Sequence, residues 1–172
     1  VKRISMILLI LFIIVTNIFF TPSFVFSSNE TQLTNYNIDV EFNPRNNVLN
    51  GSEIIEFYNS ETKDFENIYL HLYPNNFDER KDLSSLNRIP NEFDPGWIKI
   101  HNIYFNGRLI NKRDYVVNET ILKIKKDLKR DKSATLRIEF AVKIPNLIGR
   151  FGYHNDIYSL GNWYPILSVF DN

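Results

Sequence analysis

The chain has 172 residues, a length that suits one domain with a buried core. Its 20 basic and 20 acidic residues leave a formal net charge of zero, so no basic excess exists to neutralise nucleic-acid phosphates, and we expect no nucleic-acid partner. Cysteine is absent, which excludes disulfides, thiolate metal sites and cysteine nucleophiles.

The first 27 residues differ sharply in composition from the rest of the chain. Lys2 and Arg3 are followed by an almost wholly apolar run over residues 4–20, then by Pro22 and small residues. This order is typical of a secretory signal peptide, with cleavage expected after Ser27. The alternative is an uncleaved membrane anchor formed by residues 4–20, since the apolar run is long for a signal core. Either interpretation predicts that residues 28–172 form an exported domain, extracellular or held at the cell surface.

Residues 28–172 show the two-residue periodicity of β-strands. Apolar and polar side chains alternate over residues 36–42, 67–73 and 97–105, and residues 53–58 are a further strand candidate. The cleanest alternation covers residues 135–144 and ends at Pro145. Residues 74–96 are polar and interrupted by prolines, which predicts a long loop with one helical turn.

Two short polar dipeptides predict hairpins between these strands. Asn106-Gly107 separates two strand-like runs, and both residues tolerate positive φ. Asn118-Glu119 lies between residues 115–117 and 120–124 in the same way. Because no amphipathic helical pattern follows residue 30, we predict an all-β fold: an antiparallel β-sandwich or a curved, saddle-like sheet, preceded by the hydrophobic leader helix.

Familiar catalytic motifs are missing from the sequence. His71, His101 and His154 form no H-E-x-x-H arrangement, and we interpret them as ordinary sheet and loop residues. No nucleophile elbow, phosphate-binding loop or dinucleotide-binding turn is present. The carboxylates alternate with apolar residues, a pattern typical of a solvated sheet face. We therefore predict no catalytic residue, no metal ligand and no cofactor within this chain.

The last 23 residues, RFGYHNDIYSLGNWYPILSVFDN, are rich in aromatic side chains. Trp163, Tyr164 and Pro165 follow Gly161 and Asn162 directly. Such a cluster either packs onto the core as a covering loop or forms the rim of a binding site.

Four segments occur in a fixed order: YNIDVEFNPRNNVLNGSEIIEFYN (36–59), IYLHLYPNNF (68–77), LRIEFAVKIP (136–145) and GNWYPILSVFDN (161–172). Together they resemble the amino-terminal domain of the aminopeptidase N family of zinc metallopeptidases. The first segment carries the family's L-x-G step at Leu49 and Gly51 and a strand ending at Asn59. The resemblance extends over about residues 35–172 and implies a non-catalytic β-domain that walls the active site.

The departures from the family pattern bear on activity. The family's zinc site, H-E-x-x-H with a further Glu, lies on a helical domain that follows this one, and that site is missing here, as is the G-A-M-E-N segment. The resemblance therefore implies a chain that stops inside the amino-terminal domain, with zinc belonging to a separate catalytic domain. A Gln before the family's Trp-Tyr-Pro segment helps to bind the substrate amine. Asn162 occupies that position, keeps the amide, and is the substrate-binding residue implied by the resemblance.

Three functions remain open at this point. The first is the exported, non-catalytic β-domain of an aminopeptidase-N-like protein, with a catalytic peptidase domain or a peptide substrate as partner. Alone it would have no peptidase activity, because hydrolysis in this family needs zinc and a Glu that activates water. The second is a secreted β-sandwich module that binds carbohydrate or protein through exposed rings: Tyr69, Tyr73, Trp97, Trp163 and Tyr164. The third is a small hydrolase with two carboxyls facing one another at about 5–9 Å.

Overall fold

The computed structural model describes residues 33–79 and 93–168, which form eleven β-strands in the described part of the chain. Five strands make the larger sheet, in the spatial order β1 (Asn35–Asn43), β2 (Val48–Tyr58), β8 (Ser133–Lys143), β4 (Trp97–Phe105) and β5 (Arg108–Leu109). Four make the smaller sheet, in the order β11 (Ile166–Leu167), β3 (Ile68–His71), β7 (Ile121–Ile124) and β6 (Tyr115–Asn118). A separate hairpin pairs β9 (Phe151–His154) with β10 (Ile157–Leu160).

All pairings between these strands are antiparallel, and the only helical pieces in the described residues are two short 3-10 turns, η1 (Tyr73–Phe77) and η3 (Lys112–Asp114). The prediction of an all-β, antiparallel fold is therefore confirmed. Residues 1–27, predicted to be a signal peptide or an anchor helix, lie outside the described residues. Within the described ranges, no helix is long and apolar enough to span a membrane.

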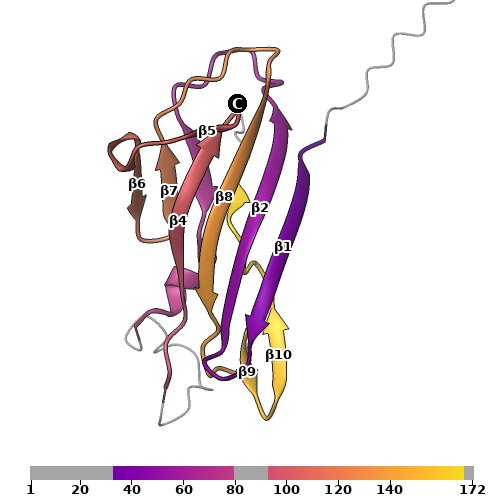
Figure 1. Ribbon diagram of the computed structural model, residues 1–172, viewed down its shortest axis with the longest axis vertical. Coiled ribbons are helices and arrows are strands. Elements are labelled where there is room, and N and C mark those ends of the chain that lie inside the picture. The colour runs from indigo at the N-terminus through magenta and orange to yellow at the C-terminus, as the bar shows by residue number, and fades with distance from the viewer. Residues whose placement is uncertain (1–32, 80–92, 169–172) are drawn as a thin grey trace, which may run out of the picture. The chain divides into compact units, whose positions relative to one another are not determined.

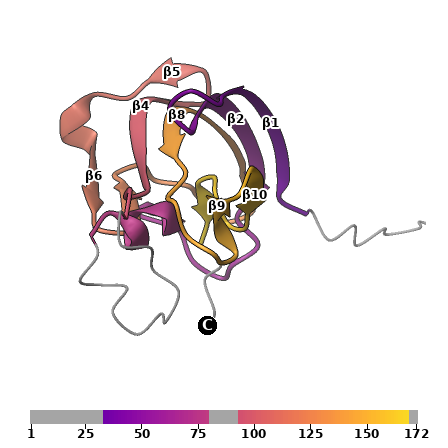
Figure 2. The ribbon, with the colours of Figure 1, turned by 90° about the horizontal axis from the view of Figure 1, so that it is seen from below.

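The larger sheet arches over the smaller one and over the β9–β10 hairpin (Figures 1 and 2). Strand β8 lies at its centre and pairs with β2 over eleven residues, from Val48 opposite Lys143 to Tyr58 opposite Ser133. Alternate residues of β8 point into the space between the sheets, where Leu136, Ile138 and Phe140 are almost fully buried. The smaller sheet contributes Leu70, Leu122 and other apolar side chains to the same core cluster. This alternation is the physical cause of the two-residue pattern in the sequence.

Glycine at position 51 allows β1 and β2 to approach closely. A Cβ atom added to Gly51 would lie 2.8 Å from the backbone oxygen of Asp39, closer than real Cβ contacts. Gly51 pairs with Val40 on β1 and with Phe140 on β8. The L-x-G step therefore has a structural role in this sheet.

The hairpin predicted at Asn106-Gly107 is confirmed, with φ of 49° and 77° at the two turn residues. The second hairpin exists, but its turn lies one residue later than predicted. Asn118 pairs with Ile121, so Glu119 and Thr120 form the turn, and Glu119 adopts the positive φ of 50°. A short polar side chain at this position is therefore not required for the turn.

Strand β4 contains an irregularity at His101. Ile100 is opposite Phe140 and Asn102 is opposite Glu139, so His101 is an extra residue on this strand. Ile98 and Ile103 are both buried although they are five positions apart, a spacing that would place them on opposite faces of a regular strand. The extra residue of the bulge therefore returns the Ile103 side chain to the inward face. His101 itself is exposed, in agreement with its interpretation as an ordinary sheet residue.

Candidate functional site

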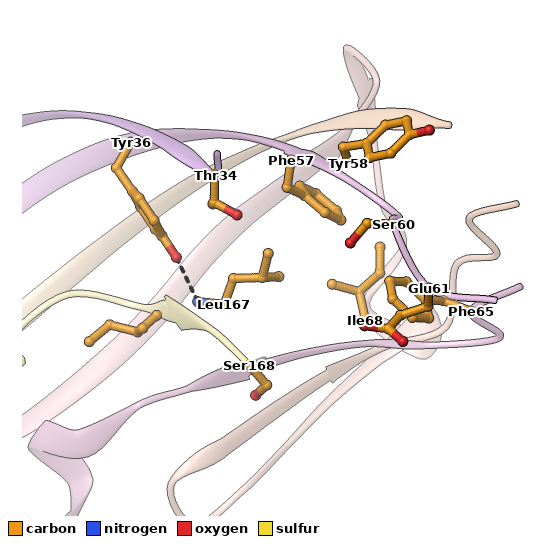
Figure 3. Close-up of a pocket in the computed structure, with 11 residues that line it drawn as sticks. Thr34, Tyr36, Phe57, Tyr58, Ser60, Glu61, Phe65, Ile68, Leu167 and Ser168 are labelled. Carbon is orange, nitrogen blue, oxygen red and sulfur yellow. Dashed lines mark hydrogen bonds between the residues drawn. The ribbon is translucent and has the colours of Figure 1, made fainter. Parts of the chain in front are cut away.

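The best-formed cavity lies at the open side of the sandwich, between the β1–β2 end of the larger sheet and the β3–β11 end of the smaller one. Its volume is about 380 Å³. Aromatic and aliphatic side chains form most of its walls, and the carboxylate of Glu61 is its one acidic group (Figure 3). The described lining consists of Thr34, Tyr36, Phe57, Tyr58, Ser60, Glu61, Phe65, Ile68, Ile166, Leu167 and Ser168.

Tyr36 connects the two sheets at this cavity. The backbone N–H of Leu167 donates a hydrogen bond to the Tyr36 hydroxyl oxygen over 3.0 Å, as the dashed line in Figure 3 shows. Burial raises the pKa of Tyr36, and the hydrogen bond from Leu167 opposes that rise only in part. Tyr36 is therefore a neutral phenol at physiological pH, and its hydroxyl serves as the acceptor of this link.

The aromatic segment after Gly161 packs onto the core. The Trp163 ring lies 6.2 Å from the ring of Phe140, and the Tyr164 ring meets the Tyr36 ring edge-on at 5.7 Å. Trp163 and Tyr164 also contact one another at 5.5 Å. Both are half-buried members of the core periphery. Of the two interpretations of this segment, the structure favours the covering loop.

Asn162 lies in the turn that leads into these rings. It adopts a positive φ of 54° and its side chain is exposed. Within the described residues, its carboxamide has no hydrogen-bond partner, so both its N–H groups and its oxygen are available to solvent or to a ligand. Asn162 does not line the cavity closed by Tyr36. The structure therefore does not bring the residue implied by the resemblance together with the best cavity.

Two asparagines in the resembling segments are structural. The buried Asn59 donates from Nδ2 to the carbonyls of Lys63 (3.0 Å) and Leu128 (3.1 Å), and its Oδ1 accepts from the backbone N–H of Glu61 (3.0 Å). These bonds hold the loop that follows β2 against the strand segment at Leu128. Asn59 thus adds a second bond to the Leu128 carbonyl, which also accepts from the N–H of Phe65, and satisfies backbone groups of the loop.

Asn75, in the HLYPNNF segment, joins three parts of the fold. Its Nδ2 donates to the carbonyl of Glu119 in the β6–β7 turn over 2.8 Å. Its Oδ1 accepts from the backbone N–H of Ile98, at the start of β4, over 2.8 Å. These two bonds therefore hold η1 between the smaller sheet, at the β6–β7 turn, and the larger sheet, at the start of β4. Nothing in the alternation of the sequence indicates this role.

Glu53 is a buried acidic residue that the sequence pattern did not reveal. Its side chain is fully buried, and neither carboxyl oxygen has a hydrogen-bond partner in the described residues. Burial raises the pKa of Glu53 to about 9, so the carboxyl is neutral at pH 7. The expectation that carboxylates line a solvated sheet face is wrong for Glu53. The sequence does indicate this position, because residues two and four positions apart on a strand share one face. Glu53 therefore lies on the inward face of β2 with Ile55 and Phe57.

Several other acidic groups of the described residues gather in one place. Asp64, Glu66 and Asp127 line a second, polar hollow together with Lys125 and Lys129. The backbone N–H of Arg130 and the ammonium of Lys129 bond to Asp64 and lower its pKa, so Asp64 itself is not suited to donate a proton. No group of three or more His, Cys, Asp or Glu side chains that could hold a metal occurs in the described residues.

Comparisons with known proteins gave only structural neighbours. No protein-family model and no curated protein matches the sequence. An M1 zinc metallopeptidase from Deinococcus radiodurans has a TM-score of 0.42 at 13% identity, and the match covers 63% of this chain and 20% of that one. A mutant of that enzyme bound to a Tyr-Ser-Ala substrate gives a TM-score of 0.41 at 12% identity, covering 63% of this chain and 19% of that one. Both neighbours are M1 zinc metallopeptidases. The chain thus spans about a fifth of the length of these structures.

Proposed function

We propose that this chain is the exported, non-catalytic β-domain of an aminopeptidase-N-like zinc metallopeptidase. In this role it walls the active site of a catalytic peptidase domain and helps to bind the amino terminus of a peptide substrate. Zinc and the Glu that activates water belong to that catalytic domain. The proposal begins from the ordered resemblance of four segments to the amino-terminal domain of the family.

The observation that carries the proposal is the way in which Trp163 and Tyr164 pack. A carbohydrate or protein binding module would expose such rings as a stacking surface. Here they anchor their segment to Phe140 and Tyr36, and the anchored segment presents the free carboxamide of Asn162 to solvent. An exposed amide on a fixed turn is suited to accept a hydrogen bond from a substrate ammonium group.

Peptidase assays test the non-catalytic role. We expect the full chain, supplied with zinc, to hydrolyse alanine p-nitroanilide no faster than zinc in buffer. Hydrolysis that a chelator abolishes and zinc restores would overturn the proposal, since it would require a metal site within this chain.

Amine recognition by Asn162 is tested by nuclear magnetic resonance of the isotope-labelled full chain. Trialanine at millimolar concentration should shift the Asn162 side-chain resonances, and N-acetyl-trialanine should not. Trialanine should also shift the backbone amides of the neighbouring Gly161 and Trp163. Asn162→Gly keeps the positive φ of the turn and should abolish this backbone response. Asn155→Gly makes the same change at another exposed turn with a φ of 48° and should leave it intact. Equal responses to both peptides would remove Asn162 from the proposed role.

A further inference from the structure

Strand β1 is a long outer strand of the larger sheet, and no strand in the described part of the chain pairs with its outer side. It pairs with β2 on one side only and lies at the outer side of the sheet in Figure 1. Its nine residues run without a register break, whereas the other outer strands of the two larger sheets, β5, β11 and β6, have two, two and four residues. Natural edge strands are blunted by lysine, proline, bulges or shortness. Strand β1 is not short and has no lysine, proline or bulge, and its only charged side chains are the carboxylates of Asp39 and Glu41.

We propose that two copies of this chain associate through β1, as an antiparallel pair around a two-fold axis at Ile38. In this register the numbers of two residues that face one another add up to 76, so residue 36 of one copy faces residue 40 of the other. The half-buried Ile38 then meets its own copy, and Tyr36 meets Val40 on the same side of the sheet. The five-stranded sheets of the two copies thereby become one continuous sheet, and β1 is no longer an outer strand in either copy.

Charge favours this register over the one whose axis lies at Asp39. On the exposed face of β1, Glu41 comes opposite Asn35 and Asp39 comes opposite Asn37. Each carboxylate therefore faces a carboxamide that can donate a hydrogen bond to it. Moving the axis by one residue to Asp39 would place the two Asp39 carboxylates directly opposite one another, which is destabilising. β1 carries no basic side chain that could offset such a repulsion.

The two ends of β1 are complementary in shape and polarity. The cavity lined by Thr34 and Tyr36 lies at the amino-terminal end. At the other end, Phe42 contacts Tyr158 of the β9–β10 hairpin at 4.9 Å, and the Tyr158 hydroxyl donates to Asn47 over 2.7 Å. This hairpin carries the most exposed apolar side chain of any strand in the described residues, Ile157, at 71%.

An antiparallel pair brings these two ends together. Thr34 and Phe42 are each four residues from Ile38, and the proposed register places them opposite one another across the axis. The exposed apolar hairpin of one copy therefore comes beside the apolar cavity of the other, twice in the dimer. An isologous contact requires this kind of self-complementarity. The inference is independent of the proposed peptidase role, because it uses neither Asn162 nor a catalytic domain.

Disulfide trapping tests the register, and the absence of native cysteine makes the experiment clean. Directly opposite residues of an antiparallel pair have Cα atoms about 4.5–5.5 Å apart, within the range of a disulfide. Under mild oxidation of the full chain in non-ionic detergent, we expect Ile38→Cys to cross-link at least ten times faster than Asp39→Cys. The two Asp39 positions would be diagonal neighbours about 7–8 Å apart, too far for easy bridging.

Val117→Cys is the matched control, since Val117 is also apolar and is 41% exposed on the outer strand β6. Association through other parts of the chain would cross-link Ile38→Cys and Val117→Cys at similar rates. That outcome, or faster trapping of Asp39→Cys than of Ile38→Cys, would overturn the proposed pairing.

Sedimentation equilibrium of the full chain tests the contact between hairpin and cavity without altering β1. Ile157→Asp should raise the dimer dissociation constant at least tenfold, because it would place a carboxylate in an apolar cavity. Val117→Asp should leave that constant unchanged. A wild-type chain that remains monomeric at 100 µM, or a dimer that Ile157→Asp does not weaken, would contradict the proposal.

Discussion

The hydroxyl oxygen of Tyr36 accepts the backbone N–H of Leu167 over 3.0 Å and thereby joins β1 to β11, two outer strands of different sheets. The two residues are 131 positions apart in the chain. Their bond closes one side of the cavity and holds the aromatic segment against the core. This single polar contact therefore couples the position of the Asn162 turn to the larger sheet.

Tyr36→Phe should loosen this coupling without unfolding the chain. The substitution removes the acceptor and keeps the ring that packs on Tyr164, so we expect a loss of about 1 kcal/mol in the free energy of unfolding. The amide of Leu167 should exchange with deuterium at least fivefold faster, as measured by hydrogen-exchange nuclear magnetic resonance. Tyr115→Phe is the control, since the Tyr115 hydroxyl makes no hydrogen bond within the described residues. An unchanged exchange rate of the Leu167 amide would show that this hydrogen bond does not hold β11 against β1.

Asn59→Ala should be among the most damaging polar substitutions. It removes three hydrogen bonds, those to the carbonyls of Lys63 and Leu128 and that from the backbone N–H of Glu61, although the Leu128 carbonyl keeps the bond from the N–H of Phe65. We expect a loss of about 2–4 kcal/mol, measured by urea denaturation followed through tryptophan fluorescence. Asn50→Ala changes an exposed residue of β2, the strand that Asn59 directly follows, and should stay within about 0.5 kcal/mol of the wild type. Similar losses for the two variants would contradict the structural role of Asn59.

Asn75→Ala should destabilise the junction between the sheets. It leaves the backbone N–H of Ile98 and the carbonyl of Glu119 without their partner. The expected loss is about 2–3 kcal/mol in the same denaturation assay. Its neighbour Asn76 provides the control, because Asn76 is exposed and Asn76→Ala removes no hydrogen bond within the described residues. A larger effect at Asn76 than at Asn75 would refute this assignment.

The strands that the sequence predicted correctly are those with one buried face. In β8, Leu136, Ile138 and Phe140 alternate with solvated residues, so the pattern follows directly from the geometry of the sheet. The β9–β10 hairpin was interpreted as loop because its turn, Asn155-Asp156, lacks the glycine that usually indicates a tight hairpin. The bulge at His101 does leave a signal, since the apolar spacing changes from two to three between Ile100 and Ile103.

The candidate site was less accessible to sequence analysis than the fold. Asn162 was identified only through the resemblance, and its exposed amide depends on rings that pack against residues far away in the chain, such as Tyr36 and Phe140. The cavity is assembled from four separate segments whose proximity is set by the pairing of the sheets. Hydrophobic periodicity reports which face of a strand is buried. It does not report which strands of two different sheets meet.

Glu53 is where the sequence pattern and elementary energetics disagree most. A carboxyl group with no hydrogen-bond partner is costly inside a core, and it remains there by keeping its proton. The pKa of Glu53 rises from an ordinary value of 4.5 to about 9 in the folded chain. Between these two values the folded chain holds a proton that the unfolded chain has released, so the free energy of unfolding should fall as pH rises.

Replacing Glu53 by Gln should abolish most of this pH dependence. The slope in the wild type should reach about 1.4 kcal/mol per pH unit between pH 5.5 and 8.5, a window above the lowered pKa of Asp64 and below the raised pKa of Tyr36. Glu53→Gln keeps the size of the side chain but cannot ionise, so its stability should be nearly constant over the window and should exceed that of the wild type at pH 8.5. Glu56→Gln, an exposed substitution three positions along β2 and therefore on its outer face, should retain the wild-type slope. Urea denaturation at four pH values measures all three slopes, and a wild-type slope that survives in Glu53→Gln would mean that another group carries the proton.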